Sequence, residues 1–218
     1  MEKSQIFDTG AHKTIEKTLV DFINVQPDFL STQTTSSTRA AGDAIQKIVS
    51  DNFQSLFRDM CKDYTARFPR RAMADLKFTD KDGFTYYVDV KTHRLGTEFN
   101  MPNLTSVRRL ASLYESDRNY FVVLFVSYTV EGTEVQVDRI HFIPIEFLSW
   151  DCLTIGALGW GQIQIANANV MDINEGYSRK KWMLEFCDLV LSFYPQEIRK
   201  INNRIDHFKQ VKEEWERK

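Results

Sequence analysis

The chain has 218 residues, of which 43% are hydrophobic and 13% aromatic; this composition predicts a folded globular domain and excludes a disordered or fibrous protein. The longest apolar run, residues 120–128, is much shorter than the roughly 20 residues that a membrane-spanning helix needs. A net charge of −2 gives no general attraction to a polyanion, so any nucleic-acid binding has to come from local basic patches.

The start of the chain and its cysteines bear on location and chemistry. Residues 1–5 are polar and lead into no apolar signal core, which predicts a cytoplasmic protein without a membrane segment. Cys61, Cys152 and Cys187 are odd in number and widely spaced, with no CxxC pair. This pattern disfavours a disulfide framework or a zinc site, and we expect inert thiols in the core.

Periodicity predicts helices first and strands next. Apolar residues recur at helical spacing over residues 11–25 and 40–57. Residues 74–91 predict a β-hairpin around a turn at residues 80–83. Helical spacing returns over residues 104–114, and two β-prone runs follow at 120–129 and 135–144.

The C-terminal part combines short glycine-containing segments with helical patterns. Glycines stand at 156, 159 and 161, and apolar residues then recur at helical spacing over residues 180–193 and 196–215. With no internal repeat and no clear linker, the whole pattern predicts one α/β domain with a central mixed β-sheet flanked by helices.

Two acids and a lysine occupy the predicted hairpin. Its strand ends opposite the turn lie side by side, so Asp75 and Asp89 are expected to meet there. Side chains alternate along a strand, so Asp89 and Lys91 should share one face, while Val88 and Val90 point into the core.

This combination suits a divalent cation. The carboxylates of Asp75 and Asp89, with the backbone carbonyl of Val90, are hard oxygen ligands that favour Mg²⁺, which also accepts a phosphate oxygen. Lys91 can then orient a water or offset charge in the transition state of phosphodiester hydrolysis. A second interpretation stays open, because acid-x-Lys is common in strands that carry only a surface ladder of Asp and Lys.

The residues around these acids resemble the PD-(D/E)XK nuclease motif. Asp75 matches its first acid and Asp89-Val90-Lys91 its second half, with Ala74 in place of the usual proline. The strand Asp89-Val90-Lys91-Thr92 and the later segment Phe-Asn-Met-Pro-Asn-Leu-Thr-Ser at 99–106 are similar to an Asp-Ile-Lys-Thr-Thr strand and a Phe-Thr-…-Thr-Ser segment. Those belong to type II restriction endonucleases of the EcoRV/HincII-like branch. The resemblance covers roughly residues 40–110.

The resemblance implies a fold, an activity and partners. It implies a PD-(D/E)XK restriction-endonuclease-like domain over residues 1–218, with a helical and dimerisation part (1–60), a catalytic sheet (70–145) and a C-terminal recognition and helical part (146–218). The implied activity is Mg²⁺-dependent hydrolysis of double-stranded DNA at a short palindrome by a homodimer, with Asp75, Asp89 and Lys91 as catalytic residues. A repair or recombination nuclease of the same fold, and a non-catalytic DNA-binding module, remain alternatives.

The resemblance also points to residues around the catalytic ones. Family members carry an acidic or amide residue on the preceding helix, which corresponds to Asp43 or Gln46. His93, without partners in the sequence, is expected to pack or contact phosphate and has no catalytic role.

Candidate DNA contacts are of two kinds. Phosphate neutralisation needs Lys or Arg near the active site, and base contacts need polar side chains that reach base edges. The candidates are Arg39, Arg70, Arg71, Thr92, Arg94, Asn100, Asn103, Thr105, Ser106, Gln164, Asn167 and Asn169. Two alternatives compete with readout: Thr105 or Ser106 as a helix cap, and residues 162–169 as a plain amphipathic strand.

Overall fold

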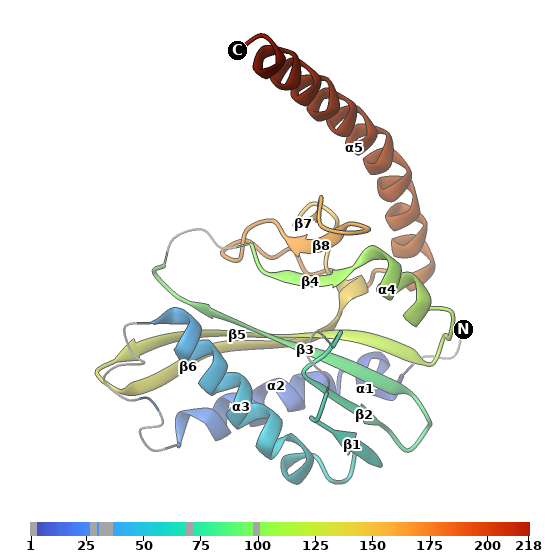
Figure 1. Cartoon of the computed structure of the whole chain (residues 1–218). Coiled ribbons are helices and arrows are strands. Elements are labelled where there is room, and N and C mark those ends of the chain that lie inside the picture. Colours follow the sequence, from blue (N-terminus) through green and yellow to red (C-terminus); the bar gives the residue numbers. More distant parts are fainter. Residues whose placement is uncertain (1–3, 27–29, 31–36, 69–71, 98–100) are drawn as a thin grey trace.

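The computed structural model describes residues 4–26, 30, 37–68, 72–97 and 101–218 (Figure 1). The helices are α1 (Gln5–Asp8), α2 (His12–Asn24), α3 (Thr38–Leu56), α4 (Val107–Leu113), the short 3-10 helix η1 (Ile145–Phe147) and α5 (Arg179–Glu216). The strands are β1 (Asp63–Thr65), β2 (Leu76–Thr79), β3 (Thr85–Arg94), β4 (Asn103–Ser106), β5 (Asn119–Glu131), β6 (Glu134–Pro144), β7 (Leu153–Gly156) and β8 (Gln162–Ile165).

The central sheet has five strands in the order β1-β2-β3-β5-β6. Strands β3 and β5 run parallel and the other neighbours antiparallel, so the predicted mixed sheet flanked by helices is confirmed. Strand β5 is rich in β-branched and aromatic residues, and its buried stretch from Tyr120 to Val126 is typical of strands buried on both faces.

Helices α2 and α3 cover one face of this sheet (Figure 1). Both are amphipathic, and their apolar sides, including Leu19 and Phe53, are fully buried against the strands. The side chain of Ser37 caps α3 by accepting a hydrogen bond from the backbone N–H of Ala40. The two predicted N-terminal helices are therefore confirmed.

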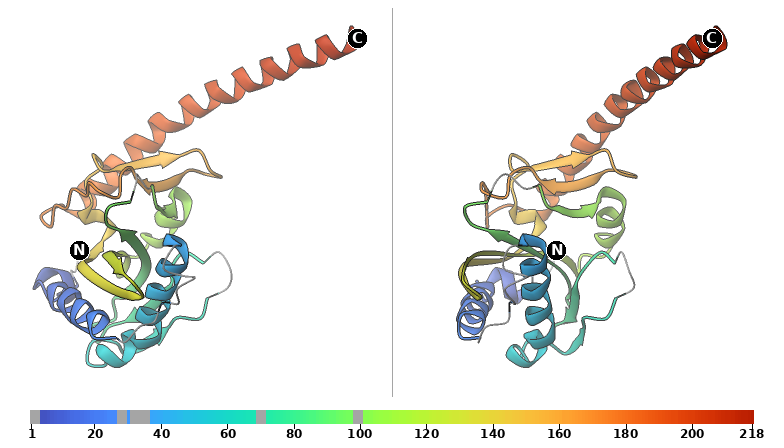
Figure 2. Two further views of the ribbon diagram at one scale, coloured as in Figure 1. Left: turned by 90° about the vertical axis from the view of Figure 1, so that its left-hand side faces the viewer. Right: turned by 60° about the vertical axis from the view of Figure 1, so that its left-hand side comes forward.

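A second, three-stranded sheet of order β4-β8-β7 lies beyond the other face of the central sheet, together with α4 (Figure 2). The prediction of one helix over residues 104–114 was wrong in its first turn. Leu104 is buried in strand β4, and the helix begins only at Val107. Pairing with β8, some sixty residues later, decides this segment, and local spacing cannot reveal such a partner.

Helix α5 is longer than predicted. The two expected helices at 180–193 and 196–215 form one continuous helix that passes through Pro195. Proline has no backbone N–H, so the helix loses one hydrogen bond there but does not end. Within the described residues no helix is both long and apolar enough to cross a membrane. Cys61 and Cys152 are buried as predicted, whereas Cys187 is exposed on α5, so the expectation of a core thiol was wrong for Cys187.

Candidate active site

The hairpin β2–β3 brings the predicted acids together. Its turn is organised by Asp80, whose Oδ1 accepts the backbone N–H groups of Asp82 at 3.0 Å and Phe84 at 2.9 Å. Gly83 adopts φ of 81°, a conformation that favours glycine. At the far end, the backbone N–H of Asp75 donates to the carbonyl of Val88 at 2.9 Å, so the pairing extends to the first acid.

Asp75 is held from two sides. Its Oδ2 accepts the backbone N–H of Val90 at 2.7 Å, and its Oδ1 accepts Nε2 of Gln46 at 2.6 Å. Gln46 belongs to α3 and Val90 to β3, so these two hydrogen bonds fix the carboxylate of Asp75 between the helix and the hairpin. Of the two residues that the sequence left open, Gln46 contacts the acid, whereas Asp43 is an exposed neighbour on the same helix.

Asp89 is buried, with 6% of its surface exposed. Its Oδ1 accepts Nζ of Lys91 at 2.7 Å, while its Oδ2 has no hydrogen-bond partner among the described residues. Burial raises the pKa of Asp89 to about 7; Lys91 lowers this pKa and the charge of Asp75 raises it. Burial also raises the pKa of Asp75, against the opposing effect of the N–H of Val90.

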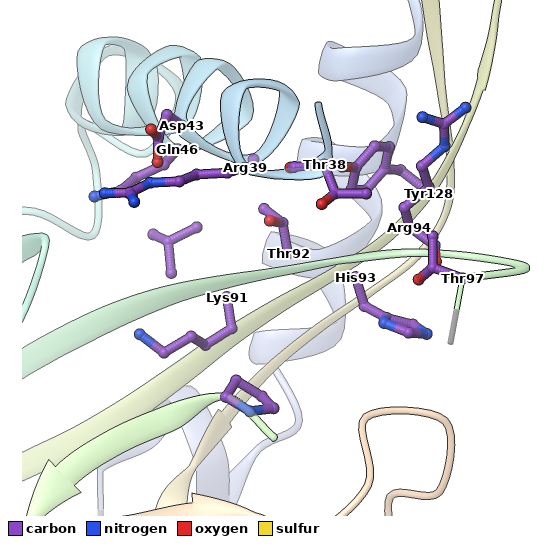
Figure 3. Close-up of a pocket in the computed structure, with 13 residues that line it drawn as sticks. Thr38, Arg39, Asp43, Gln46, Lys91, Thr92, His93, Arg94, Thr97 and Tyr128 are labelled. Carbon is purple, nitrogen blue, oxygen red and sulfur yellow. Dashed lines mark hydrogen bonds between the residues drawn. The ribbon is translucent and has the colours of Figure 1, made fainter. Parts of the chain in front are cut away.

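A cavity of about 530 Å³ opens between α3 and the end of β3. Figure 3 shows Arg39, Asp43 and Gln46 on the helix side and Lys91 and Thr92 on the strand side. The cavity is also lined by Arg94 and Pro102. Three of the predicted DNA contacts, Arg39, Thr92 and Arg94, therefore line one cavity together with Lys91.

The two predicted recognition segments meet in the small sheet. Asn103 pairs with Gln164 across β4 and β8, and Nε2 of Gln164 donates to Oδ1 of Asn103 at 2.7 Å. Both side chains contribute to an exposed polar pair, and the preceding residue Pro102 lines the cavity beside Lys91. The sheet thus places both segments next to the candidate active site. The expected strand at 162–169 is confirmed for Gln162–Ile165.

Other predicted contacts have structural roles instead. Thr105 is 3% exposed and its hydroxyl has no partner among the described residues, so it cannot reach a base edge. Ser106 caps α4 by accepting the backbone N–H of Arg109 at 3.3 Å, as its alternative interpretation predicted. Asn167 accepts the backbone N–H of Asn169 at 2.9 Å in a turn.

His93 is a packing residue. It is 2% exposed, stacks on Phe125 with ring centroids 6.2 Å apart, and pairs through Nε2 with Oδ1 of Asn169 at 2.8 Å. The hydrogen bond therefore uses the side-chain amide of Asn169, which the sequence predicted as a DNA contact. Arg70, Arg71 and Asn100 lie outside the described residues.

The sequence analysis gave no role to Gly42, which lies where α3 crosses β3. A Cβ at this position would lie 2.5 Å from Oγ1 of Thr92, so glycine lets α3 approach β3 closely enough for Gln46 to reach Asp75. A glycine inside an amphipathic helix was the available signal, because glycine weakens a helix unless close packing requires it.

The donor set fits a hard divalent cation that keeps most of its waters. Over the part of the chain that the structure describes, no three His, Cys, Asp or Glu side chains form a group that could hold a metal. The carboxylate of Asp75 instead lies close enough to Asp89 to raise its pKa, and one buried oxygen of Asp89 has no partner within the described part of the chain. No family model matches the chain, and no curated protein matches it.

Proposed function

We propose that this chain is a Mg²⁺-dependent endonuclease that hydrolyses double-stranded DNA at a short palindromic site, that is, a type II restriction endonuclease of the PD-(D/E)XK kind. One observation carries the proposal. The buried Asp89 shares a strand face with Lys91, lies close to Asp75 across the hairpin and, among the residues that the structure describes, has no hydrogen-bond partner for one carboxylate oxygen. A purely structural ladder of Asp and Lys would be exposed and fully paired, which argues against the surface-ladder alternative.

Asp75, Asp89 and the carbonyl of Val90 are the residues that would hold Mg²⁺. When bound, the ion supplies positive charge that polarises a phosphate oxygen and lowers the pKa of a water. Because Asp89 is buried, its negative charge is costly without a cation, and this gives the pair an affinity for one.

Lys91 and Gln46 have distinct roles. Lys91 holds its ammonium 2.7 Å from Oδ1 of Asp89 and is 23% exposed, so it can also reach a water or a phosphate oxygen in the cavity. There it would orient the attacking water and offset negative charge as the phosphorus is attacked. Gln46 fixes the orientation of Asp75 through Nε2 and acts as a positioning residue.

DNA contacts follow from the same surface. Arg39, Thr92 and Arg94 line the cavity, where they can bind the backbone phosphates around the scissile bond. Asn103 and Gln164 form an exposed amide pair beside it, and amides discriminate adenine by paired hydrogen bonds. Cutting both strands needs two such sites, so the proposed enzyme acts as a homodimer.

The test is to incubate the full chain with a mixed-sequence plasmid library in Mg²⁺ or in EDTA and to sequence the fragment ends. Discrete Mg²⁺-dependent ends that share a palindrome support the proposal. Scattered ends indicate a repair or recombination nuclease, and intact plasmid that is nevertheless bound indicates a DNA-binding module.

Variants connect the activity to these residues. Asp89→Asn and Lys91→Ala are each expected to lower the cleavage rate by a factor of about 100 or more, because each removes a group that acts on the reacting phosphate. Asp82→Asn is the matched control, since it makes the same chemical change at an exposed position in the turn of the same hairpin. Full cleavage by Lys91→Ala would refute the assignment.

A further inference from the structure

Helix α5 carries two apolar stripes on different sides. The first docks the helix on the body of the molecule: Trp182 is fully buried, Phe186 is 4% exposed, and Val190 packs beside them. Trp182 also donates from Nε1 to the carbonyl of Leu148 at 2.8 Å. This stripe accounts for the first part of the helix alone.

The second stripe runs the whole length of the helix and contacts its own chain at Tyr194, whose hydroxyl donates to the carbonyl of Trp160 at 2.7 Å. Its residues follow alternating steps of three and four, the heptad spacing that keeps one side of a helix facing a partner helix. They are Leu184, Cys187, Leu191, Tyr194, Ile198, Ile201, Ile205, Phe208, Lys212 and Trp215. Lys212 is the one charged side chain among them.

Apart from the half-buried Tyr194, the residues of the stripe are exposed. Leu191 is 70% exposed, Ile198 58%, and Phe208 and Trp215 67% each. Figures 1 and 2 show why: the distal part of α5 projects away from both sheets. A run of large apolar side chains left in water along one helix face marks an interaction surface.

We propose that this stripe pairs with the same stripe of a second copy of the chain, as an antiparallel coiled coil. A two-fold interface uses one patch on both copies, and a heptad stripe meets this condition by itself. Placing Ile198 opposite Ile201 of the second copy also places Leu191 opposite Phe208 and Leu184 opposite Trp215. These layers bury apolar groups against apolar groups along the helix.

The charges beside the stripe favour the antiparallel arrangement. Glu197 and Arg204 occupy equivalent positions next to the stripe, and antiparallel helices set Glu197 of one copy beside Arg204 of the other. Glu197 also contacts Lys200 of its own helix at 2.7 Å, and a carboxylate can accept from both. A parallel pair would instead bring Arg204 beside Lys209, two like charges.

The proposal puts the dimer interface on α5, whereas the sequence predicted a dimerisation part in residues 1–60. The apolar stripes of α2 and α3 are buried in the core. Among the described residues of 1–60, Val25 is the large hydrophobic side chain that remains exposed. The inference stands on the pattern and exposure of α5 and does not depend on nuclease activity. A failed cleavage assay would therefore not contradict the proposed dimer, and a monomeric chain would not by itself contradict the proposed cleavage chemistry.

The test measures the mass of the full chain by sedimentation over a wide range of concentration. We expect a dimer, and Ile201→Glu/Ile205→Glu should weaken it by about 100-fold or more, because the change places charges in the middle of the stripe. Asn203→Glu is the matched control, since it adds the same side chain on the opposite side of the helix.

Circular dichroism checks that each variant stays folded. We expect it to do so, because the substitutions leave the contact of Trp182, Phe186 and Val190 with the body of the molecule unchanged. A monomeric wild-type chain, which would leave the stripe to a different partner, or an unaffected double variant would overturn the proposal.

Orientation is tested by reversing one charge. In the antiparallel pair Arg204→Glu meets Glu197 and should weaken the dimer about fivefold, and adding Glu197→Arg should restore it. In a parallel pair Arg204→Glu would meet Lys209 and tighten the dimer, which would overturn the antiparallel arrangement.

Discussion

Asp89 carries a carboxylate in a place where burial makes a charge costly. Lys91 offsets part of that cost through Oδ1, but Oδ2 has no partner among the described residues and the charge of Asp75 adds repulsion. With the pKa of Asp89 raised to about 7, the group keeps its proton in the folded state at a pH where it would lose it in the unfolded state. The residue is therefore a source of instability in the absence of a cation.

This predicts how the stability of the metal-free protein depends on pH. In EDTA, the free energy of unfolding should fall as pH rises from about 4 to about 7, because over that range the folded state binds one proton more than the unfolded state. Asp89→Asn removes the part of this dependence that comes from Asp89 and should be more stable than the wild type by on the order of 4 kcal/mol near pH 8, and no more stable near pH 4.

Urea unfolding at a series of pH values measures the difference. Asp82→Asn, at an exposed position, should follow the wild type throughout. A constant offset between wild type and Asp89→Asn at all pH values would show that Asp89 is not a buried carboxylate with a raised pKa.

At the scale of elements, the close approach of α3 to β3 positions the site. Gly42 faces Thr92 where the helix crosses the strand, and one turn along the helix Gln46 reaches Asp75. The helix brings an amide to the acid only because nothing larger than hydrogen stands at the crossing. Packing of two elements thus determines the geometry of a single carboxylate.

Gly42→Ala tests this dependence. Alanine is the better helix former, yet its Cβ would lie 2.5 Å from Oγ1 of Thr92, so we expect a loss of about 1–3 kcal/mol in the free energy of unfolding. Displacing α3 should also lengthen the contact between Gln46 and Asp75 and lower the cleavage rate.

A second change separates the clash from other effects of the substitution. Thr92→Ala, added to Gly42→Ala, removes the hydroxyl and should recover most of the stability measured by urea unfolding. If the double variant is no more stable than Gly42→Ala, the close approach is not what requires glycine.

At the scale of the whole molecule, a buried ion pair joins the C-terminal helix to the central sheet. Nε of Arg179, the first residue of α5, donates to Oε1 of Glu146 in η1 at 2.7 Å, and Nη1 donates to the carbonyl of Asp117 at 3.0 Å. The guanidinium also stacks over Tyr120, 4.0 Å from the ring centroid. Both charged side chains are almost fully buried, 8% and 4% exposed.

Breaking one side of this pair should be far more costly than removing both. Arg179→Ala leaves Glu146 charged and buried, and we expect a loss of about 3–5 kcal/mol in the free energy of unfolding, measured in urea. Arg179→Met/Glu146→Gln removes both charges and should recover much of that loss. Equal destabilisation by the single and double variants would show that packing of the arginine, rather than the uncompensated charge, is what matters.

Local pattern in the sequence determined the hairpin and the face shared by Asp89 and Lys91, because a turn and a two-residue period are properties of adjacent residues. The helices over 11–25 and 40–57 and the strands at 120–129 and 135–144 followed from periodicity in the same way. Tertiary structure alone decided that Gln46 rather than Asp43 reaches Asp75, that Asn103 lies beside Gln164, and that Thr105 is buried. Each of these depends on the packing of segments far apart in the chain, and periodicity within one segment carries no information about its partner.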